Sequence, residues 1–175
     1  MGEVETLLGA LADENADRRR DVATQIGELS KGGGNAAPAL SPLLSILEDD
    51  EPAVRSAAST AIFWIAHKGG SPDGLPLLVR CLLDDDAMIR HDAAGALESF
   101  AQQKATTDPT AVPGLLENLG HANPHTHAAA IYCLGAYIKS GVAGRELVPR
   151  IEAQAGHADE GVRQAVERVL KSLSG

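Results

Sequence analysis

The chain has 175 residues, with 15 lysines and arginines against 24 aspartates and glutamates, and its formal net charge at pH 7 is -9. We therefore expect no nucleic-acid partner, because a general nucleic-acid binder needs lysine and arginine to displace counterions from phosphates. No apolar run reaches the roughly 18 residues of a membrane span, and the first segment, MGEVETLLGALADEN, lacks the basic start of a signal peptide. Cys81 and Cys133 are too few for a disulfide framework. We expect a cytoplasmic protein without a membrane span.

One pattern of about 36 residues recurs five times along the chain, and three of its positions show it most clearly. A basic position holds Arg19, Arg55, Arg90, His127 and Arg163. A polar position six residues earlier holds Asp13, Asp49, Asp84, His121 and His157, and an apolar position twelve residues earlier holds Leu7, Leu43, Leu78, Leu115 and Ile151. We expect a single domain over residues 1–175. Its approximate repeats are 3–35, 36–70, 71–106, 107–143 and 144–175.

Each repeat is predicted to contain a short helix, a turn and a longer helix. In the second repeat, leucines at helical spacing predict the short helix; they are Leu40, Leu43, Leu44 and Leu47. Apolar residues at the same period predict the longer helices. They are Val54, Ala58, Ala61, Ile62 and Ile65 in the second repeat, Ile89, Ala93, Ala96, Leu97 and Phe100 in the third, and Val162, Val166, Val169, Leu170 and Leu173 in the fifth. Lysines mark the ends of the longer helices, with glycine close behind most of them; they are Lys31, Lys68, Lys104 and Lys139.

A unit of this length, with proline in its first helix and an Asp-x5-Arg pattern across its turn, resembles the HEAT-repeat family. It is more closely similar to the short bacterial type found in bilin-lyase subunits. The resemblance covers Val4 to Leu173 and implies an all-α fold, a right-handed α-solenoid of about five two-helix HEAT-like repeats. Stacking is physically required, because one two-helix unit cannot bury its own apolar stripe. Such a fold hosts many functions, so function has to be argued from particular residues.

The repeated Asp and Arg positions are interpreted as a structural ladder. The resemblance to HEAT repeats implies that each Asp meets an Arg or backbone amides of a neighbouring repeat. Its members are Asp13, Arg19, Asp49, Arg55, Asp84 and Arg90. The fourth repeat interrupts the ladder with His121 and His127, and His125 lies between them. Three imidazoles in one turn could bind zinc or copper, but a zinc site needs about three or four converging ligands, and no carboxylate or thiolate is close in sequence. We favour a polar turn without metal, and metal binding by these histidines stays open.

No catalytic motif is present: the chain has no G-x-S-x-G, no H-E-x-x-H, no P-loop and no G-x-G-x-x-G. Cys133 shares a core position with Ala61 and Ala96, and Cys81 lies in an apolar helix, so both thiols are expected to be inert packing residues. We therefore expect no catalytic residue, no metal and no cofactor, and hence no enzyme.

In HEAT-like solenoids the second helix of each repeat lines the concave face, and helical phase places aromatic and charged residues there. Phe63, Trp64 and Tyr132 are framed by small residues, which is typical of an anchor pocket for a peptide or helix. The full set of candidate partner-binding residues is Arg55, Phe63, Trp64, Arg90, His91, Glu98, Tyr132 and Arg163. In the alternative interpretation, Phe63 and Trp64 pack against the next repeat, where Gly95 leaves room.

These observations favour a non-enzymatic module that binds another protein or peptide on its concave face. The resemblance to bilin-lyase subunits implies an alternative, a subunit that handles a chromophore and its carrier protein. A HEAT-like DNA glycosylase needs a strongly basic channel, which an acidic chain disfavours. Acidic turns such as Asp84–Asp86 suit either the positive ends of helices or a basic partner, and both explanations stay open. The identity of the partner and the oligomeric state are not predicted.

Overall fold

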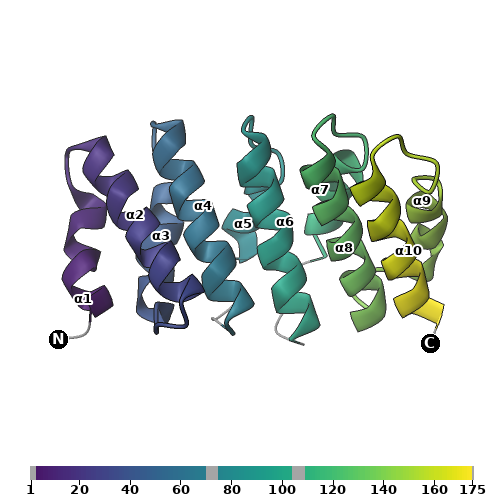
Figure 1. The fold of residues 1–175 in the computed structure, drawn as a ribbon, viewed down its shortest axis with the longest axis horizontal. Coiled ribbons are helices and arrows are strands. Elements are labelled where there is room, and N and C mark those ends of the chain that lie inside the picture. Colours follow the sequence, from purple (N-terminus) through teal and green to yellow (C-terminus); the bar gives the residue numbers. More distant parts are fainter. Residues whose placement is uncertain (1–2, 70–74, 104–108, 175) are drawn as a thin grey trace.

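The computed structural model describes residues 3–69, 75–103 and 109–174, and the regular elements in these ranges are all helical (Figure 1). The long helices are α2 (Ala16–Lys31), α4 (Pro52–His67), α6 (Ala87–Gln102), α8 (Pro124–Ser140) and α10 (Glu160–Ser174). They alternate with the short helices α1 (Glu3–Leu8), α3 (Leu40–Ser45), α5 (Leu75–Cys81), α7 (Ala111–Asn118) and α9 (Val148–Glu152). Short 3-10 turns extend several of the short helices; they are η1 (Gly9–Ala12), η2 (Ala37–Ala39), η3 (Ile46–Glu48) and η4 (Arg145–Leu147).

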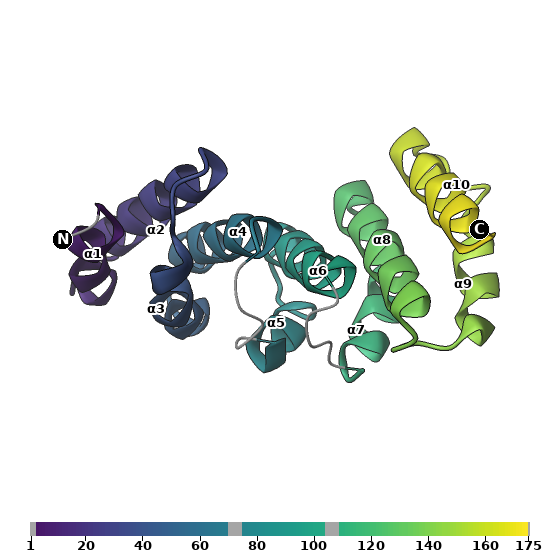
Figure 2. The same cartoon turned by 90° about the horizontal axis from the view of Figure 1, so that it is seen from below.

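The helices form two layers that run along the molecule. Each long helix packs against the next long helix, α2 on α4, α4 on α6, α6 on α8 and α8 on α10. Figure 2 shows this layer along the inner side of an arc, with the short helices outside it. The all-α solenoid predicted from the repeat is therefore confirmed.

The core lies between the two layers and between consecutive repeats. Most members of the repeated apolar position of the short helices are buried, namely Leu43, Leu78, Leu115 and Ile151. The apolar residues predicted to face the core from α4, α6 and α10 are buried too, apart from Leu170, which is half-buried. Many residues between the long helices are alanine or glycine, and this small size lets the helix backbones approach closely.

Local chemistry determines where the long helices begin and end. Asn15, Asp86 and Asn123 cap α2, α6 and α8, because their side chains accept hydrogen bonds from the first backbone N–H groups. After α8, Gly141 has a φ of 80°, a left-handed conformation that glycine adopts without strain. The helix end predicted at Lys104 and the repeat boundaries near residues 70 and 106 lie outside the described residues.

Candidate functional site

The inner face of the long helices carries a hollow toward each end of the chain. The N-terminal hollow lies between α2 and α4 and has a volume of about 370 Å³. The C-terminal hollow lies between α6, α8 and α10 and has a volume of about 310 Å³. Each is large enough to hold one or two side chains of a bound partner, since small-molecule pockets start at roughly 300 Å³.

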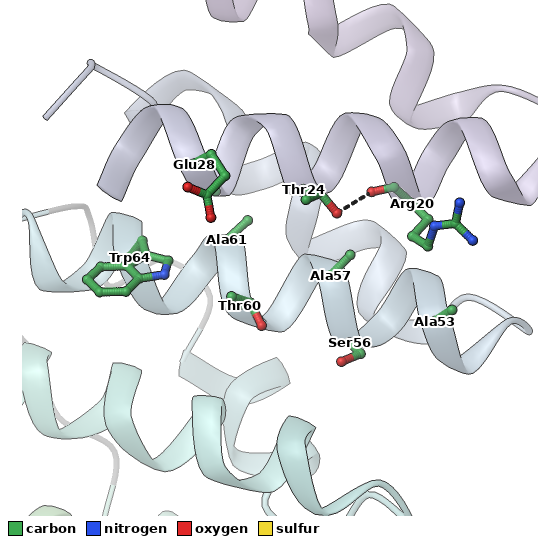
Figure 3. A pocket seen from close by; sticks show the side chains of 10 residues that line it. Arg20, Thr24, Glu28, Ala53, Ser56, Ala57, Thr60, Ala61 and Trp64 are labelled. Atoms are coloured by element: carbon green, nitrogen blue, oxygen red, sulfur yellow. Dashed lines mark hydrogen bonds between the residues drawn. The ribbon is translucent and has the colours of Figure 1, made fainter. Parts of the chain in front are cut away.

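The N-terminal hollow has an apolar floor and mixed walls (Figure 3). Gly27, Ala57 and Ala61 contribute the small residues of the floor. Trp64 and Glu28 lie toward one end of the hollow, and Arg20 lies at the other. The guanidinium of Arg20 is held there by Asp17 and Asp21, each at 2.8 Å. An incoming apolar side chain would therefore meet an aromatic wall and a floor of small residues.

Trp64 belongs to an aromatic cluster at the end of α4. The ring centroids of Phe63 and Trp64 are 5.1 Å apart, and the ring of His67 lies 6.0 Å from each of them. The ammonium of Lys31 on α2 is 5.5 Å from the centroid of the Trp64 ring, within reach of a cation–π interaction. Trp64 is half-buried, so it presents part of its ring to the hollow while its neighbours hold its orientation.

Phe63 has a different role from Trp64. A Cβ atom added at Gly95 of α6 would lie 2.6 Å from Cε2 of the Phe63 ring. The ring of Phe63 therefore lies directly over the glycine, and this contact sets how closely α4 and α6 approach. Phe63 as a whole is half-buried.

The C-terminal hollow combines an aromatic residue with charged ones. Tyr132 and Lys139 come from α8, Glu98 from α6 and Arg168 from α10, around Gly135. A Cβ added at Gly135 would lie 2.6 Å from Cγ1 of Val169, so α8 and α10 touch here much as α4 and α6 do at Gly95. The hollow therefore depends on glycine as well as on its polar walls.

Glu98 is a half-buried carboxyl group on the wall of the C-terminal hollow. Nε2 of Gln102 donates a hydrogen bond of 2.6 Å to its Oε1. Burial raises the pKa of Glu98 to about 7. Near neutral pH the group can consequently donate a hydrogen bond as an acid or accept one as a carboxylate.

The ladder arginines lie at the turns, on the edge of the inner face. Nε of Arg19 donates to Oδ2 of Asp49 in the next repeat at 2.7 Å, and Nε of Arg55 lies 3.4 Å from Oδ2 of Asp84. Each of these arginines also donates to a carbonyl of its own turn, at 2.8 Å for Arg19 and 3.0 Å for Arg55. The Arg19 guanidinium lowers the pKa of Asp49. The amides that the aspartates bind belong to their own turns, whereas the family resemblance implied amides of a neighbouring repeat.

The other charged candidates lie along the same edge. Nη1 of Arg163 donates to the carbonyl oxygens of His157 and Ala158, both at 2.7 Å. Nδ1 of His91 lies 3.2 Å from the carbonyl oxygen of His125. The structure thus brings Trp64, Tyr132 and Glu98 to the hollows, while the guanidinium groups of Arg55 and Arg163 bind the turns.

Sequence reasoning missed Asp92, which is 5% exposed between α4 and α6. Its Oδ2 accepts hydrogen bonds from Oγ1 of Thr60 at 2.6 Å and from Oγ of Ser59 at 3.1 Å. Burial raises the pKa of Asp92, although the two hydroxyl donors oppose that effect. The available signal was the repeat itself, because the equivalent position holds alanine in three of the other repeats, Ala57, Ala129 and Ala165.

Both cysteines lie in the described ranges and are buried. Burial raises the pKa of the Cys81 thiol to about 11, and complete burial raises that of Cys133 as well. Histidines, cysteines and acidic residues in the described ranges form no group of three that could hold a metal ion. None of the described helices is long and apolar enough to cross a bilayer.

A family model for HEAT repeats matches residues 4–98, more than half of the chain. The chain belongs to the HEAT-repeat family. The assignment from the proline and Asp-x5-Arg pattern is therefore confirmed. No curated protein sequence matches the chain.

Several solved structures share the HEAT-like solenoid. A designed armadillo repeat protein in complex with the peptide (KR)4 aligns with a TM-score of 0.77 at 21% identity, over 96% of this chain and 80% of that one. The complex of CpcE and CpcF of phycocyanin lyase from a Nostoc species aligns with a TM-score of 0.77 at 22% identity, over 99% and 66%. An engineered protein aligns with a TM-score of 0.75 at 20% identity, over 97% of this chain and 78% of that one. At these identities the similarity shows a common fold.

Proposed function

We propose that this HEAT-repeat protein is a non-catalytic adaptor that binds a segment of another protein along the inner face of its long helices. The observation that carries the proposal is the pair of hollows on that face, each with an aromatic wall beside small residues. Repeat solenoids of this fold are typical protein-interaction scaffolds, and the designed armadillo relative is bound to a peptide. The segment would run across α4 and α6 and insert one side chain into each hollow.

In this proposal Trp64 and Tyr132 are the anchors. Large aromatic side chains at the centre of desolvated pockets contribute most of the binding energy in many interfaces. Phe63 keeps the spacing between α4 and α6 through Gly95. Glu98 on the wall of the C-terminal hollow and His91 at the edge of the inner face would provide polar contacts. Because Arg55 and Arg163 already bind the turns, we assign the polar contacts with the partner to His91 and Glu98 first.

A selection of displayed random peptides on the full chain tests the proposal. Peptides selected on the wild type should bind Trp64→Ala and Tyr132→Ala at least about tenfold more weakly, the loss expected for a hot-spot residue. Met88→Ala is the matched control, because Met88 is 48% exposed at the start of α6 and lines neither hollow. Thermal melts show that the variants fold. Peptides that bind both aromatic variants as tightly as the wild type would contradict the proposal.

A second candidate is a subunit that handles a bilin chromophore and its carrier protein. The observation that favours it is the placement of Lys139 and Arg168 beside Tyr132 in the C-terminal hollow, where two cations and an aromatic ring could receive a propionate-bearing chromophore. Against it, the guanidinium of Arg55 is committed to Asp84 and its own turn. Adding a bilin and recording visible absorption distinguishes the candidates: a shift that disappears in Lys139→Ala/Arg168→Ala supports the chromophore, and an unchanged spectrum contradicts it.

A further inference from the structure

The turn between the two helices of every repeat contains the same hydrogen bond. A side chain at the start of the turn accepts from the backbone N–H two residues further on. In the first three repeats the acceptor is aspartate Oδ1, in the pairs Asp13–Asn15 at 2.9 Å, Asp49–Glu51 at 3.0 Å and Asp84–Asp86 at 2.9 Å. In the last two it is histidine Nδ1, in the pairs His121–Asn123 at 3.1 Å and His157–Asp159 at 3.0 Å.

The two acceptors respond differently to acid. A carboxylate keeps its acceptor atoms down to about pH 4, whereas an imidazolium has a proton on both nitrogens and accepts nothing. The observed bonds require His121 and His157 to be neutral, with the ring proton on Nε2. Protonation of the two rings would break both bonds and leave the aspartate turns intact.

The same replacement removes the inter-repeat ion pair. Arg19 and Arg55 each meet the aspartate of the next repeat, but His121 occupies the equivalent place opposite Arg90. Within the described residues, Nε of Arg90 is buried and makes no hydrogen bond. Of these three arginines, Arg90 is therefore the one without an aspartate from the next repeat. A proton on His121 would add positive charge at this position.

The junction between α8 and α10 is also built from imidazoles. The ring centroids of His127 and His157 are 4.8 Å apart, and His127 is 2% exposed. Burial lowers the pKa of His127, and the nearby imidazoles of His157 and His121 lower it further, while a hydrogen bond with Gln154 acts in the opposite direction. The folded protein thus binds a proton on His127 less readily than the unfolded chain does.

Few acidic groups around these rings are free to stabilise a positive charge on a protonated imidazole. On the α9–α10 side, Arg163 donates to the carbonyl of His157, and Oδ1 of Asp159 accepts from the backbone N–H of Val162.

On the α5–α6 side, the acidic residues are already engaged or exposed: Asp84 pairs with Arg55, Asp86 caps α6, and Asp85 is exposed. His91 and His125 form a further imidazole pair there, with ring centroids 6.3 Å apart, and Glu160 at the start of α10 is exposed.

We propose that the junctions of α8 with α6 and with α10 form an acid-sensitive switch, in which protonation of His121, His127 and His157 loosens the two C-terminal repeats from the rest of the solenoid. The sign follows from linkage at His127: because folding lowers the pKa of this residue, the junction is at full strength above the unfolded-state histidine pKa of about 6.5 and weakens as the pH falls below it. The N-terminal repeats keep their Asp–Arg pairs in the same range. Residues of α8 and α10 line the C-terminal hollow, so acid would also widen that hollow and release a bound partner. Only this consequence rests on the proposed function.

Hydrogen exchange of the full chain at about pH 7.5 and about pH 5.5, corrected for the intrinsic rate, tests the switch. Amides of α8 and α10 should lose several-fold more protection than those of α2 and α4 at about pH 5.5, because the folded state binds a proton on His127 less readily than the unfolded chain does. Equal losses in both halves would overturn the proposal. No partner is involved, so this result does not depend on the proposed function.

A double variant, His121→Asn/His157→Asn, isolates the cause. Asparagine Oδ1 accepts from the N–H two residues on at either pH, as Asn15 and Asn123 already do in this chain. The acid-induced loss should shrink at least about threefold, and adding His127→Gln should remove most of the remainder. His67→Gln on α4 should leave it unchanged. If the double variant loses as much protection as the wild type, the histidines are not the switch.

A titration of the wild type by NMR covers the case in which the variants fold poorly. The ring nitrogens of His121 and His157 should show the Nε2-protonated tautomer at about pH 7.5 and titrate over the same range in which protection of α10 is lost. Titration in a different range, or the opposite tautomer, would overturn the proposal.

Discussion

The ring of Phe63 on α4 lies over Gly95 on α6, so close that a Cβ at position 95 would stand 2.6 Å from it. One glycine therefore determines how two neighbouring repeats stack, and it lies at the middle of the inner face between the two hollows. Any larger residue there would push the ring or the helices apart.

Gly95→Ala tests this contact. We expect a loss of about 1–3 kcal/mol in the free energy of unfolding, because overpacking forces the ring or the backbone to move. In a Phe63→Ala background the same change should become neutral or stabilise by up to about 1 kcal/mol, since alanine is the better helix former. Urea unfolding of the four proteins of this cycle measures both terms. A loss that persists without the phenyl ring would contradict the contact.

Glu98→Gln tests the raised pKa of this carboxyl group. Its pKa of about 7 in the folded protein lies above the unfolded-state value of about 4.5, so the folded state binds the proton more tightly. The contribution of Glu98 to stability is therefore greatest below about pH 4.5 and declines as the pH rises through about 7. We expect Glu98→Gln to be nearly neutral at low pH and stabilising at about pH 8, by chemical unfolding at each pH. The exposed Glu117→Gln is the control, and a stabilisation independent of pH would refute the assignment.

Asp49→Asn tests the ladder between the first two repeats. Arg19 lowers the pKa of Asp49, so this carboxylate stabilises the fold above the ordinary aspartate pKa of about 3.8, and that contribution declines as the pH falls below it. Asparagine keeps an acceptor for the amide of Glu51 but removes the charge. We expect destabilisation at pH 7 that shrinks toward pH 3, while the exposed Asp50→Asn has little effect. Equal effects of both substitutions at pH 7 would show that the pair with Arg19 contributes nothing.

The two thiols give a test of packing without substitutions. Because burial raises the pKa of Cys81 to about 11, only about one thiol in a thousand is ionised at pH 8, and Cys133 is buried more completely. A thiol reagent such as DTNB should leave both unmodified in the folded protein and modify both in denaturant. Cys81 should react before Cys133 as denaturant increases. Rapid reaction of either thiol in the native protein would contradict the burial.

Much of the fold follows from the sequence because the same residue pattern occurs five times along the chain. Three positions recur at the same spacing: the apolar position of Leu43 and Leu78, the acidic position of Asp49 and the basic position of Arg55. An ambiguous assignment in one repeat can therefore be checked against the others. The two hollows are harder to predict, because they depend on side chains from different repeats. Trp64 and Tyr132 could be assigned to the inner face by helical phase, but the packing of Phe63 on Gly95 required the distance between α4 and α6.

Two features were decided only by tertiary structure. Asp92 reads in sequence as an ordinary polar residue beside His91, and it is the approach of α4 that encloses its carboxyl group with Ser59 and Thr60. The histidines of the fourth and fifth repeats were recognised from sequence as an interruption of the ladder, yet their role as Nδ1 acceptors and the contact of His127 with His157 depend on ring orientation.

The sequence by itself determined the architecture, since periodic apolar residues can be buried in only one way when two-helix units stack. It also determined which repeats depart from the pattern, because a departure is visible as soon as the period is known. Only the tertiary structure decided which side chains share a hollow, which charges lose their partners and which imidazoles meet. Those properties depend on distances of a few ångströms between residues about 36 positions apart, and the period of a repeat carries no information about them.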